Sequence, residues 1–525
     1  MFIMSGLRLI FTFFSIIVLS VFNSFAQPKK LEQDARNAML SATRFMVEKA
    51  SVNGGYVAHY LPDFSRRWGE LEGFKTQVWV QDPGTVSMGN VFLDAYKATG
   101  EEYYYLAAEK VANALIWGQL PEGGWNYMID FAGDRSLKHW YNTIGKNAWG
   151  FEEYYYYYGT STFDDSNTSG PASFLLRLYL QKMDVKYKPA LDKAIQLVID
   201  SQYPLGGWPQ RFPLKDNHPK NGKEDYSAYY TYNDEVISGN IDFLIQCYIS
   251  LGEQRFLDPI RRGMNFYLIT QQGNPQGGWG QQYNMDLQVA HARSYEPPAL
   301  MPGFTYTHVL LLMKYYQLTG DRKFLARIPD AIQWLESCRL PAEKSLGGTR
   351  THATFIELGT NKGLYAHRKG TGVKDGQYWW DYDDNNLLAH YGGKTNINIQ
   401  FLKDEFQRVN ALSSEEATRN SPLKAGISKD GILPQSQFIT TSSNSVIPDE
   451  TTISGIIKAL DQDRWLVKHI QISRPYSVLP DGSEMNTAKL SDENGKGIVD
   501  SSEQQYISTR EYEKNMGLLI RYLKR

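Results

Sequence analysis

Four clusters of polar side chains could do chemistry, and each of them follows a Gly-Gly-aromatic tripeptide. The clusters are Gln81-Asp82-Pro83-Gly84, Phe163-Asp164-Asp165-Ser166-Asn167, Tyr232-Asn233-Asp234-Glu235 and Ala292-Arg293-Ser294-Tyr295-Glu296. Carboxylates from separate segments can hold a hard cation, and Ca²⁺ favours such oxygen ligands. An Asp or Asn before a helix is also the expected N-cap. Capping does not account for Arg293 and Glu296 in the fourth cluster, nor for Trp208 and Arg211 within GGWPQRFP.

The composition and the absence of other motifs argue against a zinc site, a nucleotide-binding site and a strongly charged partner. The nine histidines show no spacing typical of zinc ligands, and the only two cysteines, Cys247 and Cys338, are far apart in the sequence. No nucleophile elbow, phosphate-binding loop or dinucleotide fingerprint is present in a fitting context. A formal net charge of −2 indicates neither nucleic acid nor an anionic membrane as partner.

The clusters belong to an internal repeat of roughly 70–80 residues. The tripeptides are Gly54-Gly55-Tyr56, Gly123-Gly124-Trp125, Gly206-Gly207-Trp208 and Gly277-Gly278-Trp279, with a fainter echo at Gly347-Gly348-Thr349. An apolar-periodic run, a tight turn and a second such run ending near Gln119, Gln202 or Gln272 precede the later tripeptides. A helical hairpin cannot bury both of its apolar stripes alone, so neighbouring hairpins must cover them. The pattern predicts an all-α fold, an α/α toroid (an incomplete barrel of helical hairpins) with long loops and short strands on one face. An open solenoid is the alternative.

Both ends of the chain differ from the repeat. Arg8, an apolar run from Leu9 to about Val21, and Ser24-Phe25-Ala26 are typical of a signal peptide, which predicts a cleaved segment 1–26 and a secreted or periplasmic protein. We expect the toroid to span residues 27–405. Residues 406–525 are expected to be loop-rich, to end in a helix over Thr509–Leu523, and to pack on the toroid. We expect a monomer.

At this point the motifs resemble those of family 10 pectate lyases. The matching segments are GGWPQ at 206–210 followed by Asn233-Asp234, Thr162-Phe163-Asp164-Asp165, QQY at 281–283 with ARSYEPP at 292–298, and FIELGTNKGLYAHR at 355–368. The resemblance spans roughly residues 85–385, and three ordered motifs together are specific.

The resemblance implies calcium-assisted β-elimination on a uronic-acid-containing, pectate-like polysaccharide. It places Asp164 and Asp234 at the Ca²⁺ and substrate carboxylate, and Arg293 as the base that removes the C5 proton. It further implies a substrate contact through Arg368, and we assign Trp208, Arg211, Asn233 and Glu296 to substrate binding. Arginine is a poor base because its pKa is above about 12. Arg293 is therefore assigned from the resemblance and not from its chemistry.

The chain departs from the family pattern in two places. Thr354 stands where the family usually has arginine, and residues 375–380 represent another arginine-bearing motif only in part. Arg350, Lys362 and Lys374 are candidates to compensate.

Three other functions stay open. An inverting glycosidase would use Asp164 and Asp234 as two carboxyl groups about 6.5–9.5 Å apart. A toroid without activity would bind carbohydrate only. The acidic run at Asp381-Tyr382-Asp383-Asp384 superficially resembles terpene cyclases, which the signal peptide disfavours.

Overall fold

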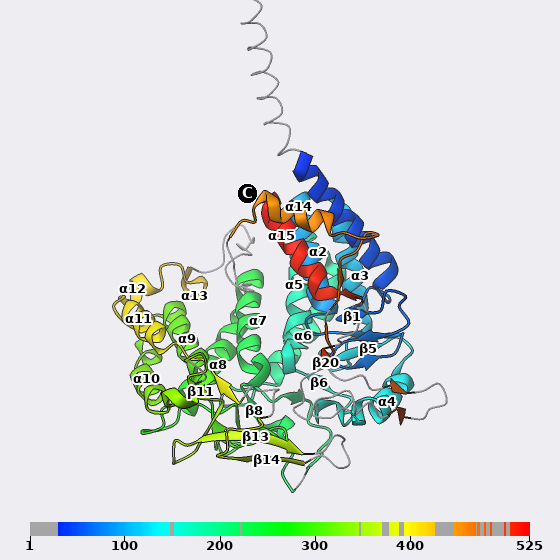
Figure 1. Ribbon diagram of the computed structural model, residues 1–525. Helices are drawn as coiled ribbons and strands as arrows, with labels where there is room; N and C mark the ends of the chain where they lie inside the picture. The colour runs from blue at the N-terminus through cyan, green and yellow to red at the C-terminus, as the bar shows by residue number, and fades with distance from the viewer. Residues whose placement is uncertain are drawn as a thin grey trace, which may run out of the picture.

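The computed structural model describes the chain between residues 30 and 524 with several gaps (Figure 1). The described residues are 30–147, 152–220, 222–345, 348–369, 377–387, 393–425, 446–468, 470–472, 477–478, 484–485, 498–499 and 505–524. The predicted signal peptide and Gly347 lie outside them. Within the described residues, no helix has the length and apolar character needed to cross a membrane.

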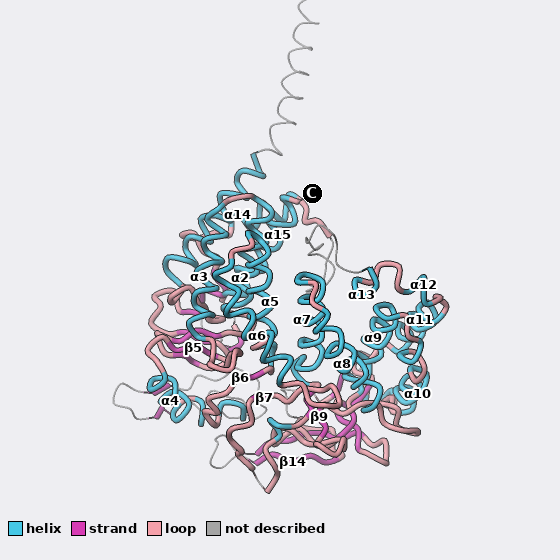
Figure 2. The backbone as a smooth tube through the Cα atoms, turned by 180° about the vertical axis from the view of Figure 1, so that it is seen from behind, coloured by secondary structure: helices cyan, strands magenta, loops and turns pink. Residues whose placement is uncertain are grey.

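Four helical hairpins form the framework of the described structure. They are α2 (Thr85–Thr99) with α3 (Glu102–Gly118), α5 (Ser169–Lys182) with α6 (Lys188–Asp200), α7 (Val236–Leu251) with α8 (Leu257–Thr270), and α9 (Pro302–Thr319) with α10 (Ile328–Ser337). Helix α5 contacts both α2 and α7, and α8 contacts α9, so the hairpins follow one another around an arc. Figures 1 and 2 show the hairpins in this order, from α2 and α3 to α9 and α10. The prediction of an incomplete α/α toroid is confirmed.

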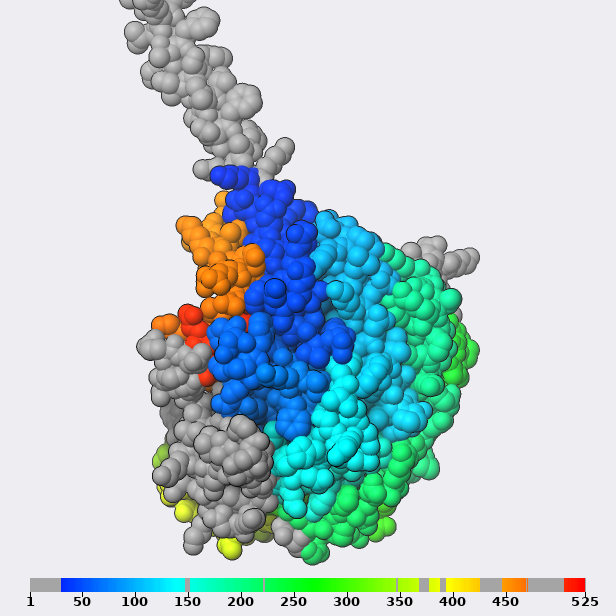
Figure 3. Space-filling view, turned by 90° about the vertical axis from the view of Figure 1, so that its right-hand side faces the viewer, coloured from blue at the N-terminus to red at the C-terminus, as the bar shows by residue number. Residues whose placement is uncertain are grey.

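Helices from the two ends of the chain extend the arc. Helix α11 (Ile399–Asn410) packs on α9 and α10, and α12 (Ser414–Ala417) and α13 (Pro422–Ala425) pack on α9. Helix α15 (Thr509–Leu523) lies against α2 and α14 (Glu450–Lys458). A helix over residues 30–45 continues as the π-helix Met46–Ala50, and its Thr43 hydroxyl lies 2.6 Å from the hydroxyl of Tyr512 on α15. Figure 3 shows these N-terminal and C-terminal residues side by side.

The Gly-Gly-aromatic tripeptides join consecutive hairpins. The indole N–H of Trp208 donates to the carbonyl of Val198 on α6, at 2.7 Å, and Trp125 and Trp279 make the equivalent bonds to Leu115 and Tyr267. Gly206 has φ +108°, and a Cβ there would stand 2.1 Å from the carbonyl oxygen of Arg262 on α8. Glycine is therefore required by both conformation and space. The tripeptide is a structural joint between one hairpin and the next.

A glutamine strengthens each joint. Gln202 Nε2 donates to the carbonyls of Gly206 and of Pro259 on the next hairpin, both at 2.9 Å. Gln119 and Gln271 repeat this pattern. At the third joint the bonding side chain is Gln271, which precedes Gln272, the residue near which the sequence places the end of the helical run.

Short antiparallel ladders gather at one end of the hairpins, the lower end in Figure 1. Three two-stranded ladders lie between repeats: β4 (Gln77–Trp79) with β5 (Met128–Asp130), β6 (Ser161–Thr162) with β7 (Arg211–Phe212), and β8 (Tyr230–Thr231) with β9 (Gln282–Tyr283). A four-stranded sheet has the order β10 (Ala299–Leu300), β12 (Phe355–Glu357), β13 (Gly363–Lys369), β14 (Gln377–Asp381). These strands place the loops of the candidate site.

The remaining strands are short. A five-stranded sheet combines β16 (Leu466–Val467), β21 (Tyr506–Ser508), β1 (His59–Tyr60), β2 (Arg67–Trp68) and β3 (Glu72–Gly73). The other pairs are β11 (His352–Ala353) with β15 (Lys394–Thr395), β17 (Gln471–Ile472) with β20 (Ile498–Val499), and β18 (Ser477–Val478) with β19 (Glu484–Met485). Helix α4 (Asp134–Thr143) lies below the first hairpin.

Candidate functional site

Two acidic turns from consecutive repeats face each other at the centre of the site. Each follows a strand that bonds to the tripeptide tryptophan: Thr162 N–H donates to the Trp125 carbonyl, and Thr231 N–H to that of Trp208. The turns Asp164–Ser166 and Asn233–Glu235 pack together. By this register Asp164 is equivalent to Asn233, and Asp165 to Asp234. The sequence-based pair of Asp164 and Asp234 therefore joins non-equivalent positions, and aligning the two repeats would have pointed to Asp165.

Both turns have a strained backbone at the same places. Asp165 and Ser166 have φ of 48° and 58°, and Asp234 and Glu235 have 50° and 60°. Non-glycine residues adopt the left-handed region at a cost, and such strain is concentrated at functional sites. This shared backbone conformation brings the acidic side chains of the two successive repeats close to each other.

Arg293 reaches that point from the loop between β9 and β10. Its guanidinium contacts four carboxylates: Glu153 at 3.0 Å, Asp164 at 3.3 Å, Asp234 at 3.4 Å and Glu296 at 3.4 Å. The residue is 5% exposed. Met301 N–H donates to the Trp279 carbonyl as Thr162 and Thr231 do to Trp125 and Trp208, and Arg293 lies before Met301 whereas the acidic turns lie after Thr162 and Thr231. Arg293 therefore does not occupy a repeat-equivalent position as the sequence suggested. The structure nevertheless brings Arg293, Asp164 and Asp234 together.

The charges of this cluster do not balance. Burial alone would lower the pKa of Arg293, but Glu153, Glu296 and Asp164 outweigh it and raise that pKa well above its usual value. Burial and the neighbouring Asp164 raise the pKa of both Asp165 and Asp234 well above the ordinary range of a carboxyl group. Asp164 and Asp234 both contact Nη2 of Arg293, so the two carboxyl groups share one cationic partner. Burial also raises the pKa of Glu153, to about 7, despite the attraction of Arg293. The cluster has more carboxyl groups than one guanidinium can neutralise.

Several partners of the cluster were missed from the sequence. Glu153 makes the shortest ion pair to Arg293, and nothing in its tyrosine-rich surroundings indicated this. The Tyr127 hydroxyl donates to Asp164 at 2.6 Å, and the Tyr154 hydroxyl donates to Glu70 at 2.6 Å. Gln81, from the first polar cluster, donates to Asp165 at 3.0 Å. These contacts link segments of three repeats that are distant in the sequence.

The donor set fits an added cation at Asp164 and Asp234. The Oδ1 atom of Asp164 is buried without a hydrogen-bond partner, which is costly for a carboxylate. Asp234 places a second carboxyl group beside it, and the two share a single guanidinium, that of Arg293. Among the described residues no three His, Cys, Asp or Glu side chains are arranged to hold a metal by themselves. Two carboxylates would therefore hold a cation together with oxygen atoms of substrate or water.

Two residues predicted to bind substrate instead have structural positions. Trp208 is 0% exposed and forms the joint to α6, so its ring faces the core and the prediction is wrong. Glu296 is also 0% exposed and accepts the backbone N–H of Arg293 at 2.7 Å, so it positions Arg293.

Two other residues predicted to bind substrate, Arg211 and Asn233, contact residues of the acidic cluster. Arg211 is buried between the rings of Tyr127 and Tyr158 and donates to the Glu153 carbonyl at 3.3 Å, which shields it from substrate. Asn233 donates to Asp234 at 2.7 Å and lines an adjoining cavity. The side chain of Arg368 lies outside the described part of the chain.

A cavity of about 890 Å³ adjoins Asp234. Asn233, Thr354 and Arg350 line it, so Arg350 shares a cavity with the position of the absent arginine. Lys362 instead lies 5.0 Å from the ring of Tyr382, and Lys374 lies outside the described residues. Of the two candidates that the structure describes, Arg350 is the one placed to compensate for the absent arginine.

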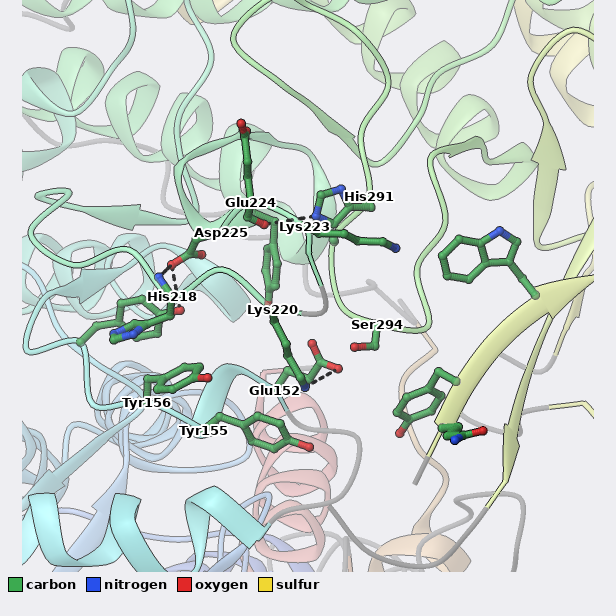
Figure 4. A pocket seen from close by; sticks show the side chains of 16 residues that line it. Glu152, Tyr155, Tyr156, His218, Lys220, Lys223, Glu224, Asp225, His291 and Ser294 are labelled. Carbon is green, nitrogen blue, oxygen red and sulfur yellow. Dashed lines mark hydrogen bonds and ion pairs between the residues drawn. The ribbon is translucent and has the colours of Figure 1, made fainter. Parts of the chain in front are cut away.

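A second cavity, of about 500 Å³, lies beside the Arg293 loop (Figure 4). Ala292 and Ser294, the neighbours of Arg293, line it. Its other walls carry tyrosines, two lysines, two histidines and Trp380. The site therefore has a buried charged centre flanked by two cavities.

Comparison with known protein families gives the same family that the sequence motifs resemble. Residues 140–379 match the model of a family described as pectic acid lyase. Comparison with curated proteins gives no match. Among solved structures, the family 10 polysaccharide lyase from Cellvibrio cellulosa is 18% identical with a TM-score of 0.41, over 62% of this chain and 98% of that one.

Two further solved structures are also similar. A mutant of the Cellvibrio lyase in complex with trigalacturonic acid has 18% identity and a TM-score of 0.40, over 61% of this chain and 98% of that one. An alpha-1,6-mannanase from Salegentibacter sp. has 14% identity and a TM-score of 0.33, over 59% and 71%. The family match includes Asp164, Asp234 and Arg293 and supports a polysaccharide lyase. It confirms the resemblance that the motifs indicate, and it identifies residues 140–379 as a segment similar to pectic acid lyases.

Proposed function

We propose that this protein cleaves a uronic-acid-containing, pectate-like polysaccharide by calcium-assisted β-elimination. The observation that carries the proposal is the contact of one arginine, Arg293, with Asp164 and Asp234 from two successive repeats. The match of residues 140–379 to pectic acid lyases supports the same reaction class.

The reaction needs a base, a neutralised carboxylate and a leaving group. The C5–H bond and the C4–O bond break, a C4–C5 double bond forms, and the released sugar oxygen takes a proton from solvent. Asp164 and Asp234 would hold Ca²⁺, which when bound neutralises the uronate carboxylate and so acidifies the C5 proton.

Arg293 is the proposed acceptor of the C5 proton. Among the described residues it is the basic side chain that contacts both Asp164 and Asp234. Proton removal needs the neutral guanidine, which Glu153 and Glu296 disfavour because they raise the pKa of Arg293. The guanidinium form also serves the reaction, since a buried cation stabilises the negative charge that develops on the uronate.

The close approach of the two aspartates argues against an inverting glycosidase. That mechanism needs room for a water molecule between two carboxyl groups about 6.5–9.5 Å apart. Asp164 and Asp234 instead contact the same nitrogen of Arg293, at 3.3 Å and 3.4 Å, so the guanidinium stands beside both carboxyl groups where that water would be needed. The N-terminal apolar run supports action outside the cytoplasm, as a secreted or periplasmic enzyme.

Incubation with polygalacturonate and Ca²⁺ tests the function. We expect an increase in the ultraviolet absorbance of the unsaturated product, and its loss when EDTA is added. Reducing ends without that absorbance would show a glycosidase, and binding without either signal would show a carbohydrate-binding protein. Each of these two outcomes overturns the proposal.

A further inference from the structure

We propose that the cavity of about 500 Å³ beside the Arg293 loop binds a second uronate residue of the substrate, with Lys223 as the partner of its carboxylate. This rests on the proposed function, because it assumes an acidic polysaccharide. The volume lies within the range of ligand pockets, about 300–1,000 Å³. None of its lining residues was assigned a role from the sequence.

A tight turn places two lysines in this cavity. The backbones of Lys220 and Lys223 bond to each other in both directions, at 3.0 Å and 2.9 Å. Residues paired in this way project their side chains from the same face of the ladder. Figure 4 shows both lysines among the residues that surround the open space.

The carboxylates of the cavity already have partners. Glu152 pairs with Lys220 at 3.0 Å. Asp225 is buried and accepts the backbone N–H groups of His218 and Ser227, both at 2.9 Å. Glu224 accepts the hydroxyl of Tyr229 at 2.8 Å. The negative charges that line the cavity are therefore engaged within the protein.

Lys223, in contrast, has no carboxylate within ion-pair distance in the described part of the chain. Its ammonium stands 4.3 Å from the centre of the Trp380 ring, as Lys220 stands 4.0 Å from that of Tyr155. Partial burial lowers the pKa of Lys223 although Glu152 opposes this effect. The Lys223 ammonium group is held against an aromatic ring and has no ion-pair partner among the described residues, so it is suited to bind a substrate carboxylate.

The walls of the cavity suit a sugar ring and continue to the reaction centre. The rings of Tyr156 and His218 are stacked at 4.1 Å with an interplanar angle of 6°, which forms a flat, rigid side. Ala292 and Ser294 line the cavity on either side of Arg293 in the chain, and Glu152 precedes Glu153. A uronate bound here would be adjacent to the residue at which cleavage takes place.

Calorimetric titration of the full chain with trigalacturonate in EDTA tests the cavity without the cation and without turnover. We expect binding, about tenfold weaker binding for Lys223→Ala, and affinity within a few-fold of wild type for Lys223→Arg, which keeps the charge. Lys215→Ala, an exposed lysine outside the cavity, is the matched control and should bind as wild type. Maltotriose, which is neutral, should not bind.

Equal affinity of wild type and Lys223→Ala, or equal binding of maltotriose, would overturn the cavity proposal. The two proposals fail separately. If Ca²⁺ and polygalacturonate give no unsaturated product while EDTA-resistant binding depends on Lys223, the lyase proposal fails and the cavity proposal stands. If product forms and Lys223→Ala leaves KM unchanged, the cavity proposal fails alone.

Discussion

Arg293 Nε lies 3.0 Å from Glu153 Oε2, although 140 positions separate the two residues in the sequence. Both side chains are at most 7% exposed. An ion pair at this depth stabilises the protein only if each charge keeps its partner. The contact ties the loop before β10 to the segment before β6, and so holds the candidate base against the acidic turns.

Arg293→Ala should abolish lyase activity. We expect a loss of at least about 100-fold in kcat, because an acid–base residue contributes about that much or more. The variant should also lose about 3–5 kcal/mol of stability, because Glu153 and Glu296 lose the guanidinium that compensates their buried negative charges. Product absorbance and urea unfolding measure the two effects. Arg262→Ala removes an exposed pair to Asp258 and is the control. Full activity in folded Arg293→Ala would refute the base assignment.

Calcium should raise the unfolding temperature through Asp164 and Asp234. A ligand that binds only the folded state stabilises it by about 2.7 kcal/mol at a hundredfold excess over Kd. Asp164→Asn and Asp234→Asn should lose this shift, whereas Asp258→Asn on the surface of α8 should keep it. Differential scanning fluorimetry with Ca²⁺ or EDTA measures the shift. The cation site is wrong if Asp234→Asn responds to Ca²⁺ as strongly as wild type does.

Trp208→Phe should weaken folding and leave KM unchanged. The substitution removes the indole N–H that donates to the buried Val198 carbonyl at 2.7 Å and leaves that carbonyl with the longer bond from the Ser201 hydroxyl, at 3.3 Å, a loss of about 1 kcal/mol. Trp279→Phe at the equivalent joint should behave alike. Urea unfolding and the KM for polygalacturonate check this. An increased KM with unchanged stability would instead restore the sugar-binding role first predicted for Trp208.

Glu513 should make stability depend on pH. Burial and the nearby Asp82 raise the pKa of Glu513 from 4.5 to about 8, although Ser87 and Arg510 oppose them. A carboxyl group with a raised folded-state pKa stabilises most below its unfolded pKa, and this contribution is lost as the pH rises through about 8. Glu513→Gln should therefore gain about 1–3 kcal/mol over wild type at about pH 9, and little at about pH 4. Urea unfolding at both pH values measures the difference. A pH-independent difference would contradict the assignment.

The sequence by itself determined the repeat, the kind of fold that it forms and three residues of the candidate site. Apolar periodicity and the spacing of the Gly-Gly-aromatic tripeptides predicted helical hairpins in an incomplete ring, because these patterns follow from local geometry and from the need to cover two apolar faces. The motifs also predicted that Asp164, Asp234 and Arg293 belong to one site.

Only the tertiary structure decided what each side chain contacts. Trp208 belongs to a joint between hairpins, Glu153 is the partner of Arg293, and Asp165 is the repeat equivalent of Asp234. The physical reason is that these contacts join segments of different repeats. Their geometry depends on how neighbouring hairpins pack and on loops of unequal length, and no local pattern in the sequence records either one.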